Sequence, residues 1–199
     1  ETFDLEQVKA KLEDVRIVYM QATETSTGAR HDVKAIANLV KANDALLVVD
    51  GITGLGTTHL DVDGWGVDVI IGGSQKAVMA PPGLAYLSVS EKAWERMVRA
   101  KQPRYYFDLY KERKSAANGE SAYTPATSLI AALAAAMDYI RAMGKGDRAA
   151  GRESLIDNAE TVAAMTREAV QALGLKLFAP TCPAAAVTAV QTPEGLDSG

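Results

Sequence analysis

The chain is short of several residue types, and each shortage excludes a class of protein. Its 199 residues include a single cysteine, Cys182. A disulfide framework within the chain is therefore excluded, and we expect a reducing compartment, the cytoplasm. No apolar run approaches the ~18 residues that a membrane span needs, and no signal peptide is recognisable. The two histidines, His31 and His59, are too isolated to predict a metal site, so surface or capping roles are expected.

Basic residues are also fewer than acidic ones, with 21 Lys and Arg against 25 Asp and Glu. The formal net charge is −4 and the isoelectric point is about 5.3, which argues against nucleic acid or an anionic membrane as a partner. The remaining composition, 48% hydrophobic and 23% charged, is ordinary for a globular protein. The length predicts one domain, or one domain plus part of a second. Because the chain does not begin with methionine, we expect a piece of a longer protein.

Hydrophobic periodicity predicts helices and strands in alternation along the chain. Short apolar runs bounded by polar or glycine residues are typical of buried parallel strands, and this alternation predicts an α/β fold with a mainly parallel sheet. The predicted strands are residues 15–22, 45–49, 67–71, 84–89, 175–178 and 185–190. The predicted helices are residues 5–13, 33–42, 91–99, 127–143 and 147–173, and residues 101–122 are expected to be an extended connection.

The long helix predicted at the end of the chain divides it into parts. A helix of this length is unusual within a globular domain and indicates a bridge between two domains. We therefore predict a large domain over residues 1–145, a linking helix over 146–173, and the beginning of a small domain over 174–199.

Polar clusters follow three of the predicted strands, at residues 23–28, 50–56 and 74–76. If the strands are parallel, their carboxyl ends meet at one edge of the sheet, which is where open α/β sheets bind ligands. The glycines of the second cluster are in the wrong order for a dinucleotide-binding fingerprint and indicate a flexible turn. The sequence therefore predicts a ligand site at this edge that Asp50 and Lys76 share.

An aspartate and a lysine at one site suit pyridoxal phosphate chemistry. The lysine can form a Schiff base, and the carboxylate can keep the pyridine nitrogen protonated. We expect Lys76 to be partly desolvated between apolar runs, which favours the neutral amine. We expect Asp50 to be a buried carboxylate in need of a partner. The alternatives are a solvated surface lysine and an aspartate that caps a helix.

Several segments resemble the class V aminotransferases. Residues 74–85 (Ser-Gln-Lys-Ala-Val-Met-Ala-Pro-Pro-Gly-Leu-Ala) resemble the Schiff-base segment of that family. Residues 24–28 (Glu-Thr-Ser-Thr-Gly), 46–50 (Leu-Leu-Val-Val-Asp) and 123–126 (Tyr-Thr-Pro-Ala) are similar to other family motifs. The resemblance covers essentially the whole chain and is nearest to the alanine–glyoxylate, serine–glyoxylate and serine–pyruvate aminotransferases.

The resemblance implies roles for individual residues toward pyridoxal 5'-phosphate. Lys76 would form the imine with the cofactor and shuttle the proton during amino transfer, while Asp50 would pair with the pyridinium nitrogen. Thr25 would hydrogen-bond near the 3-hydroxyl group, Gln75 would help hold the phosphate, and the backbone near Ile52 would contact the ring.

The resemblance also implies a fold and an assembly. The fold is the large domain of a fold type I pyridoxal phosphate enzyme, without its N-terminal part, followed by the start of a small α+β C-terminal domain. Tyr123 and Thr124 would reach the cofactor phosphate of a neighbouring subunit, which implies a homodimer with shared active sites. The phosphate-binding glycine loop, the ring-stacking aromatic residue and the carboxylate-binding arginine of the family would lie outside this chain.

The activity implied is amino transfer from alanine or serine to glyoxylate or pyruvate. Two alternatives stay open at this stage. One is another enzyme or homologue of the same fold, either a lyase or a relative described as a hydrogenase subunit. The other is an inert piece that serves only folding or dimerisation.

Overall fold

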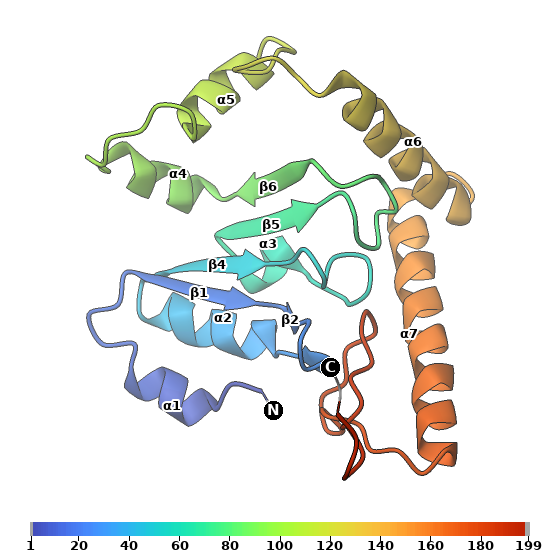
Figure 1. Ribbon diagram of the computed structural model, residues 1–199. Coiled ribbons are helices and arrows are strands. Elements are labelled where there is room, and N and C mark those ends of the chain that lie inside the picture. Colours follow the sequence, from blue (N-terminus) through green and yellow to red (C-terminus); the bar gives the residue numbers. More distant parts are fainter. Residues whose placement is uncertain (1, 198–199) are drawn as a thin grey trace.

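The computed structural model describes residues 2–197 and contains a mainly parallel sheet with helices around it (Figure 1). This confirms the α/β prediction. The strands are β1 (Ile17–Gln21), β2 (Thr23–Glu24), β3 (Ala29–Arg30), β4 (Leu46–Asp50), β5 (Val69–Gly73) and β6 (Ala85–Val89). The helices are α1 (Leu5–Ala10), α2 (Val33–Ala42), α3 (Val62–Trp65), α4 (Glu91–Val98), α5 (Leu109–Ala116), α6 (Thr127–Met143) and α7 (Arg148–Ala172).

The main sheet has the strand order β1-β4-β5-β6. β1, β4 and β5 are parallel, and β6 is antiparallel to β5. The last residues of the parallel strands are in register, since Gln21 pairs with Asp50 and Asp50 pairs with Ile71. The carboxyl ends of these strands therefore form one continuous edge.

Helix α2 covers one face of the sheet. Its apolar residues Val33, Ile36, Ala37 and Val40 recur at helical spacing and are all buried, which is the pattern of an amphipathic helix on a core. They pack with sheet residues Met20, Leu47, Val49 and Ile70 in one cluster. Burial of each large aliphatic side chain contributes about 1.5–3 kcal/mol, so this layer holds the parallel strands together. Asp32 accepts a hydrogen bond from the Ala35 amide at 2.9 Å, which confirms the predicted helix cap.

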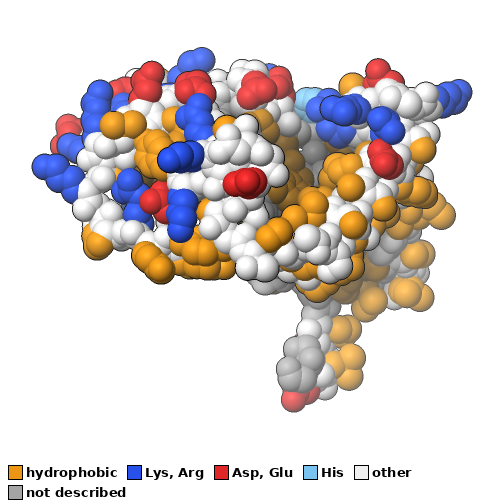
Figure 2. Space-filling model, turned by 90° about the horizontal axis from the view of Figure 1, so that it is seen from above, with side chains coloured by type: hydrophobic (Ala, Val, Ile, Leu, Met, Phe, Trp, Pro, Cys, Tyr) orange, Lys and Arg blue, Asp and Glu red, His pale blue; other side chains and the backbone are white. Residues whose placement is uncertain are grey.

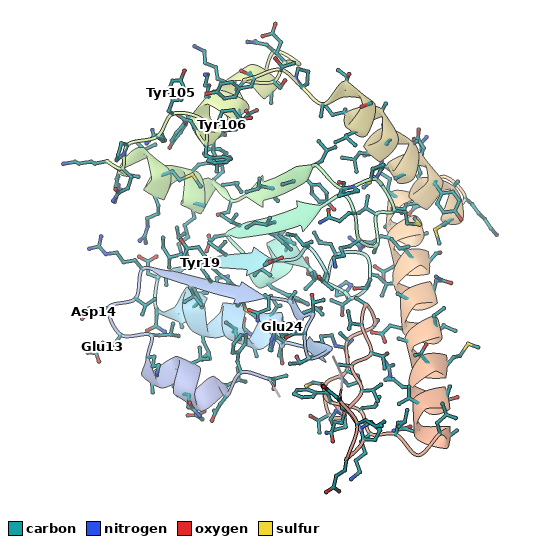
Figure 3. All side chains as sticks on the ribbon, viewed as in Figure 1. Glu13, Asp14, Tyr19, Glu24, Tyr105 and Tyr106 are labelled. Carbon is teal, nitrogen blue, oxygen red and sulfur yellow. The ribbon has the colours of Figure 1, made fainter. Side chains whose placement is uncertain are left out.

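The opposite face of the sheet is only partly covered. Ala93 of α4, with Met97 beside it, packs on Leu46 and Val69. Toward the carboxyl ends of the strands this face is open, and Tyr19 is 73% exposed (Figure 3). Asp50 at this edge is exposed, and Gln21 and Ile71 beside it are partly exposed.

Helices α6 and α7 follow each other through a short turn at residues 144–147, and the end of α6 packs against the first turns of α7 (Figure 1). Asp147 accepts a hydrogen bond from the Ala150 amide at 2.7 Å and so begins α7. The predictions of both helices are confirmed. The helices cross closely because Gly151 has no side chain, and a Cβ atom there would meet the carbonyl oxygen of Ile140.

Two predictions of secondary structure are wrong. Residues 101–122 are not simply extended, because Asp108 accepts a hydrogen bond from the Tyr110 amide at 3.0 Å and caps α5. Residues 175–178 and 185–190 do not form strands; one isolated bridge joins Leu177 to Val190. Two backbone hydrogen bonds flank that bridge, from Phe178 N–H to Ala189 at 2.9 Å and from Gln191 N–H to Lys176 at 2.8 Å. The loop between the two segments bonds to β3 and the turn before it: Arg30 N–H donates to Cys182 and Ala184 N–H donates to Gly28, both at 2.8 Å. The proposed division at residues 145 and 173 stays a prediction.

Within residues 2–197, no helix is long and apolar enough to cross a membrane.

His31 is buried, against the expectation of a surface or capping role. Only 8% of it is exposed, and its ring stacks on Phe3 with the ring centroids 4.1 Å apart. Neither ring nitrogen has a hydrogen-bond partner in the described part of the chain. Burial lowers the pKa of His31 below its usual 6.5, and this outweighs the opposing attraction of Glu24.

This burial predicts a loss of stability on acidification. Below about pH 6.5 the unfolded chain protonates His31 while the folded chain resists it, so the free energy of unfolding falls as the pH drops toward the folded-state pKa. His31→Phe keeps the ring stack and removes that part of the dependence. Urea unfolding at about pH 7.5 and about pH 5.5 measures it. The wild type should lose more unfolding free energy between these two pH values than His31→Phe; an equal loss in the two proteins would contradict the prediction.

Candidate active site

The polar clusters predicted at the strand ends do meet at one edge of the sheet. The register of β1, β4 and β5 brings Gln21, Asp50 and Ile71 side by side. The segments that follow these strands carry Thr25, Thr53 and Lys76. The parallel arrangement therefore confirms the shared edge on which the site prediction depends.

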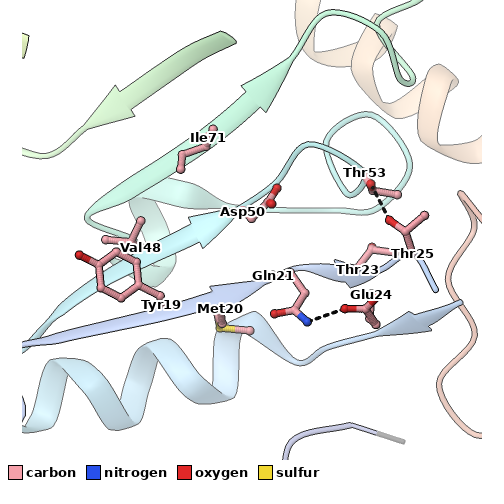
Figure 4. A pocket seen from close by; sticks show the side chains of 10 residues that line it. All are labelled: Tyr19, Met20, Gln21, Thr23, Glu24, Thr25, Val48, Asp50, Thr53 and Ile71. Atoms are coloured by element: carbon pink, nitrogen blue, oxygen red, sulfur yellow. Dashed lines mark hydrogen bonds between the residues drawn. The ribbon is translucent and has the colours of Figure 1, made fainter. Parts of the chain in front are cut away.

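Asp50 faces a cavity of about 390 Å³ at this edge (Figure 4). The cavity is lined by Tyr19, Met20, Gln21, Thr23, Glu24, Thr25, Val48, Asp50, Thr53 and Ile71. One carboxylate oxygen of Asp50, Oδ1, accepts a hydrogen bond from the Ile52 amide at 2.9 Å. The other oxygen has no hydrogen-bond partner among the residues that the structure describes. It is therefore available to a ligand with a donor group.

Asp50 is exposed rather than buried, so the expectation of a costly buried carboxylate is wrong. The reason lies in the tertiary structure. Asp50 is in register with Gln21, and its side chain lies on the sheet face that α4 covers only at the opposite end of the strands. The apolar strand Leu46–Asp50 is buried for most of its length, but its last residue is not.

The turn after β1 is fixed by Glu24. Its Oε1 atom accepts hydrogen bonds from the Ser26 amide at 2.9 Å and the Ser26 hydroxyl at 2.6 Å, and its Oε2 atom accepts one from Gln21 Nε2 at 2.8 Å. These hydrogen bonds lower the pKa of Glu24 below its usual value. The Ser26 hydroxyl contributes most, followed by the Ser26 amide and Gln21. Glu24 therefore stays ionised and holds Thr25 toward the cavity, where the hydroxyl oxygens of Thr25 and Thr53 are 3.1 Å apart.

Lys76 lies in the turn that follows β5 and lines a second cavity, of about 350 Å³. Thr53 lines this cavity as well as the one at Asp50, so the two cavities adjoin. Lys76 is exposed, so the expected partial desolvation is wrong. Of the apolar residues after it, Val78 and Ala80 are buried and Met79 is itself 53% exposed. Within residues 2–197, no hydrogen bond or ion pair engages its Nζ atom.

Gln75 and Ile52 lie beside each other at the end of β5. A Cβ atom on Gly73 would be 2.9 Å from Gln75 Oε1 and 3.3 Å from Ile52 Cγ2. Glycine at this position therefore lets the two side chains approach the strand end together. Four of the predicted cofactor-contacting residues, Asp50, Ile52, Gln75 and Lys76, thus gather at the edge with Thr25 nearby.

The glycine-containing turn after β4 is closed by hydrogen bonds. Leu55 N–H donates to the Gly51 carbonyl at 2.8 Å, and Thr57 Oγ1 donates to the Thr53 carbonyl at 2.9 Å. Gly56 has a φ of +79° and packs so tightly that a Cβ atom there would be 3.0 Å from both Ala77 and Leu155. The sequence prediction of a flexible turn missed this role. The turn packs between the Lys76 segment and α7.

Tyr123 and Thr124 line neither of these cavities. The Tyr123 hydroxyl donates to the Tyr105 carbonyl at 2.9 Å, and the Tyr123 ring centroid lies 4.5 Å from that of Tyr106. Tyr105 and Tyr106 lie near α5, far from Glu24 in the view of Figure 3. The structure therefore does not bring this pair to the cavities of its own chain.

Sequence reasoning missed three residues of the site: Gln21, Glu24 and Thr53. Gln21 could have been found from the register, since the last residues of neighbouring parallel strands lie side by side. Glu24 stands in a motif that was recognised, but its hydrogen bonds to both sides of the turn depend on the folded geometry. Thr53 lies within a turn that was interpreted only through its glycines.

The family model of the class V aminotransferases matches residues 1–179. The chain belongs to this family. Family membership therefore joins the shared edge of the sheet as a reason to consider Lys76 and Asp50 together.

The relatives of this class V aminotransferase chain are about twice as long as the chain itself. The small subunit of a soluble hydrogenase from a Synechococcus species is 40% identical over 92% of this chain, which spans 46% of that protein. An L-aspartate–glyoxylate aminotransferase from Paracoccus denitrificans is 36% identical over 93% of the chain and 46% of its own length. The crystal structure of an alanine–glyoxylate aminotransferase from a Nostoc species superposes with a TM-score of 0.90 at 27% identity, covering 99% of this chain and 52% of that one.

The family and its fold type I structural neighbours depend on pyridoxal phosphate, and the residues at the edge fit that cofactor. Asp50 has an oxygen free to accept a hydrogen bond from a pyridinium nitrogen, and Lys76 has an amine engaged by no described residue. Each of the two adjoining cavities has one of these charged side chains in its lining, Asp50 in the first and Lys76 in the second. By contrast, no cluster of three or more His, Cys, Asp or Glu side chains in the described chain could hold a metal ion.

Proposed function

We propose that this chain is the lysine-bearing part of a pyridoxal phosphate-dependent aminotransferase. The full-length protein would move an amino group from alanine or serine to glyoxylate or pyruvate. The observation that carries the proposal is the common edge of the sheet, where Lys76 and Asp50 line adjoining cavities. Among the described residues, the Lys76 amine has no hydrogen-bond partner, and only one of the two carboxylate oxygens of Asp50 has one. The family membership of the chain supports the reaction type, and the glyoxylate aminotransferases among its relatives support the acceptor.

Each residue of the edge has a proposed task. Lys76 supplies the amine to which the cofactor attaches, and its Nζ atom takes and returns the proton of the substrate α-carbon. When bound, pyridoxal phosphate supplies the electron sink that lets that proton leave. Asp50 keeps the pyridine nitrogen protonated. Thr25 binds near the 3-hydroxyl group, Gln75 helps hold the phosphate, and the backbone at Ile52 contacts the ring.

The proposed assembly is a homodimer with shared sites, in the cytoplasm. Tyr123 and Thr124 would contact the cofactor phosphate of the neighbouring subunit, in keeping with their distance from the cavities of their own chain. Tyr105, Tyr106 and Phe107 beside them are 84%, 58% and 90% exposed. A cluster of exposed aromatic residues of this kind favours a protein partner, here a second copy. Neither nucleic acid nor a membrane is a proposed partner.

A second candidate function comes from the relatives described as soluble hydrogenase subunits. They are 40% and 41% identical to this chain, above the values for the glyoxylate aminotransferases. In that case, or in a lyase of the same fold, Lys76 and Asp50 would persist but the exchange of amino groups between alanine and glyoxylate would fail. An assay of that exchange in the full-length protein separates these candidates.

Reductive trapping tests the proposed cofactor site directly. The protein is incubated with pyridoxal phosphate and reduced with borohydride, and the modified peptide is identified by mass. Label on the peptide that contains Lys76 is the expected result, because this amine is exposed and unpaired at the edge. Exposed lysines such as Lys9 and Lys41 serve as internal controls for indiscriminate labelling. Label spread evenly over the lysines, or centred elsewhere in the full-length protein, would refute the proposal.

A further inference from the structure

A third cavity, of about 520 Å³, lies between α6, α7 and the turns after β4 and β5. In the space-filling view a hollow with hydrophobic walls separates the sheet part from the α6–α7 pair, and Lys and Arg side chains gather on the rim of the helix side (Figure 2). The cavity is lined by Leu55, Gly56, Val78, Tyr86, Met137, Asp138, Ile140, Arg141, Arg148, Arg152 and Leu155. Neither Asp50 nor Lys76 lines it, although it adjoins the cavity of Lys76 through the shared lining residues Gly56 and Leu155.

The rim of this third cavity carries one uncompensated positive charge. Arg141 is paired with Asp138, with the nearest nitrogen and oxygen 3.1 Å apart, and Arg152 is paired with Glu153 at 3.0 Å. Arg148 has no carboxylate within ion-pair distance in the described chain, although it is exposed and at the start of α7. An arginine guanidinium of this kind presents paired N–H donors that match the geometry of a carboxylate.

The wall below the rim is apolar. Leu55, Val78, Met137, Ile140 and Leu155 supply it, and burial of a ligand's methylene groups against them removes apolar surface from water. A volume of about 520 Å³ lies within the usual range of small-molecule sites. The wall therefore favours a hydrocarbon chain over a small hydrophilic anion.

Tyr86 adds a neutral polar group to this wall. Its hydroxyl donates a hydrogen bond to the Gly73 carbonyl at 3.4 Å. Burial raises the pKa of Tyr86 above its usual value of 10.0, so the phenol adds no negative charge. The site thus offers one cationic group above an apolar pocket.

We propose that this third cavity binds a small amphipathic monoanion, a carboxylate on an unbranched apolar chain. Arg148 holds the carboxylate at the rim, and the chain lies against Val78, Met137 and Leu155. Gly56 and Leu155 also line the cavity of Lys76, so the occupant touches the segments that seat the lysine turn. This site is independent of the proposed aminotransferase activity.

Calorimetric titration of the full-length protein with octanoate tests the proposal. Octanoate should bind, while acetate, which has no chain, 1-octanol, which has no charge, and inorganic phosphate should bind at least about tenfold more weakly. Arg148→Met keeps an apolar stem and removes the charge, and it should weaken octanoate binding by about tenfold or more, the equivalent of about 1.4 kcal/mol. Met137→Glu, at a lining position that is 43% exposed, should weaken binding as well by repulsion.

The matched control is Lys145→Met. Lys145 is exposed, lies three residues before Arg148 and does not line the third cavity. This variant should bind octanoate within about twofold of the wild type, because a distant exposed charge is screened by solvent and salt. Equal losses in Lys145→Met and Arg148→Met, tighter binding of phosphate than of octanoate, or no heat of octanoate binding would overturn the proposal.

Discussion

Replacing Lys76 by alanine is expected to abolish the exchange of amino groups by the full-length protein. Proton transfer by a positioned side chain alone contributes about 10²–10⁴-fold to a rate, and Lys76 is also the proposed point of attachment for the cofactor. We therefore expect the turnover number with alanine and glyoxylate to fall by about 10³-fold or more. Steady-state assay of the two proteins, each saturated with pyridoxal phosphate, measures the loss.

Lys9→Ala is the matched control for this prediction. Lys9 lies on α1, is exposed, and lines none of the three cavities described above. Its replacement should leave the turnover number unchanged. Unfolding curves of both variants should overlay that of the wild type, since each substitution removes an exposed side chain. Retention of more than a tenth of the activity by Lys76→Ala would rule out the role assigned to this amine.

Gly151→Val is expected to cause the largest loss of stability. A Cβ atom at residue 151 would collide with the carbonyl oxygen of Ile140 and lie 3.3 Å from the Cα atom of Arg141. Both are backbone atoms of α6 and cannot rotate away. Glycine in a helix costs about 1 kcal/mol relative to alanine, but overpacking at such a crossing costs about 1–3 kcal/mol or more. We expect a net loss of about 2 kcal/mol in the free energy of unfolding.

Urea denaturation of Gly151→Val and Ala149→Val isolates the crossing from the helix propensity of valine. Ala149 lies two residues earlier in α7 and is exposed, so its replacement should cost only the propensity difference of a few tenths of a kcal/mol. The same midpoint for both variants would show that α6 and α7 can separate freely. In that case the close contact at Gly151 would contribute nothing to the fold.

The shared edge of the candidate site was predictable because parallel strands leave little freedom. Once residues 45–49 and 67–71 were interpreted as parallel strands, Asp50 and the segment before Lys76 had to end on the same side. Helices α2, α6 and α7 were predictable for a similar reason: their apolar periodicity and their caps or glycine stops are local signals.

The exposure of the site residues was not predictable from local sequence. Apolar neighbours suggested that Asp50 and Lys76 are covered, yet coverage depends on which helix lies over the end of the strand, and α4 lies over the opposite end. The same dependence explains His31, whose burial comes from Phe3, distant in the sequence. The segments predicted as strands at the end of the chain pair only around the Leu177–Val190 bridge, and the loop between them also pairs with β3 and its preceding turn.

The amino-acid sequence by itself determined the family of this chain, the order of the main-sheet strands and of helices α2, α6 and α7, and the sheet edge at which its lysine and aspartate lie. These properties follow from short-range patterns and from the geometry of parallel strands. Only the tertiary structure decided how open that edge is, how Glu24 orders the Thr25 turn, and that α6 and α7 enclose a third cavity with an unpaired arginine. Those features arise from contacts between residues far apart in the chain, whose packing no local pattern encodes.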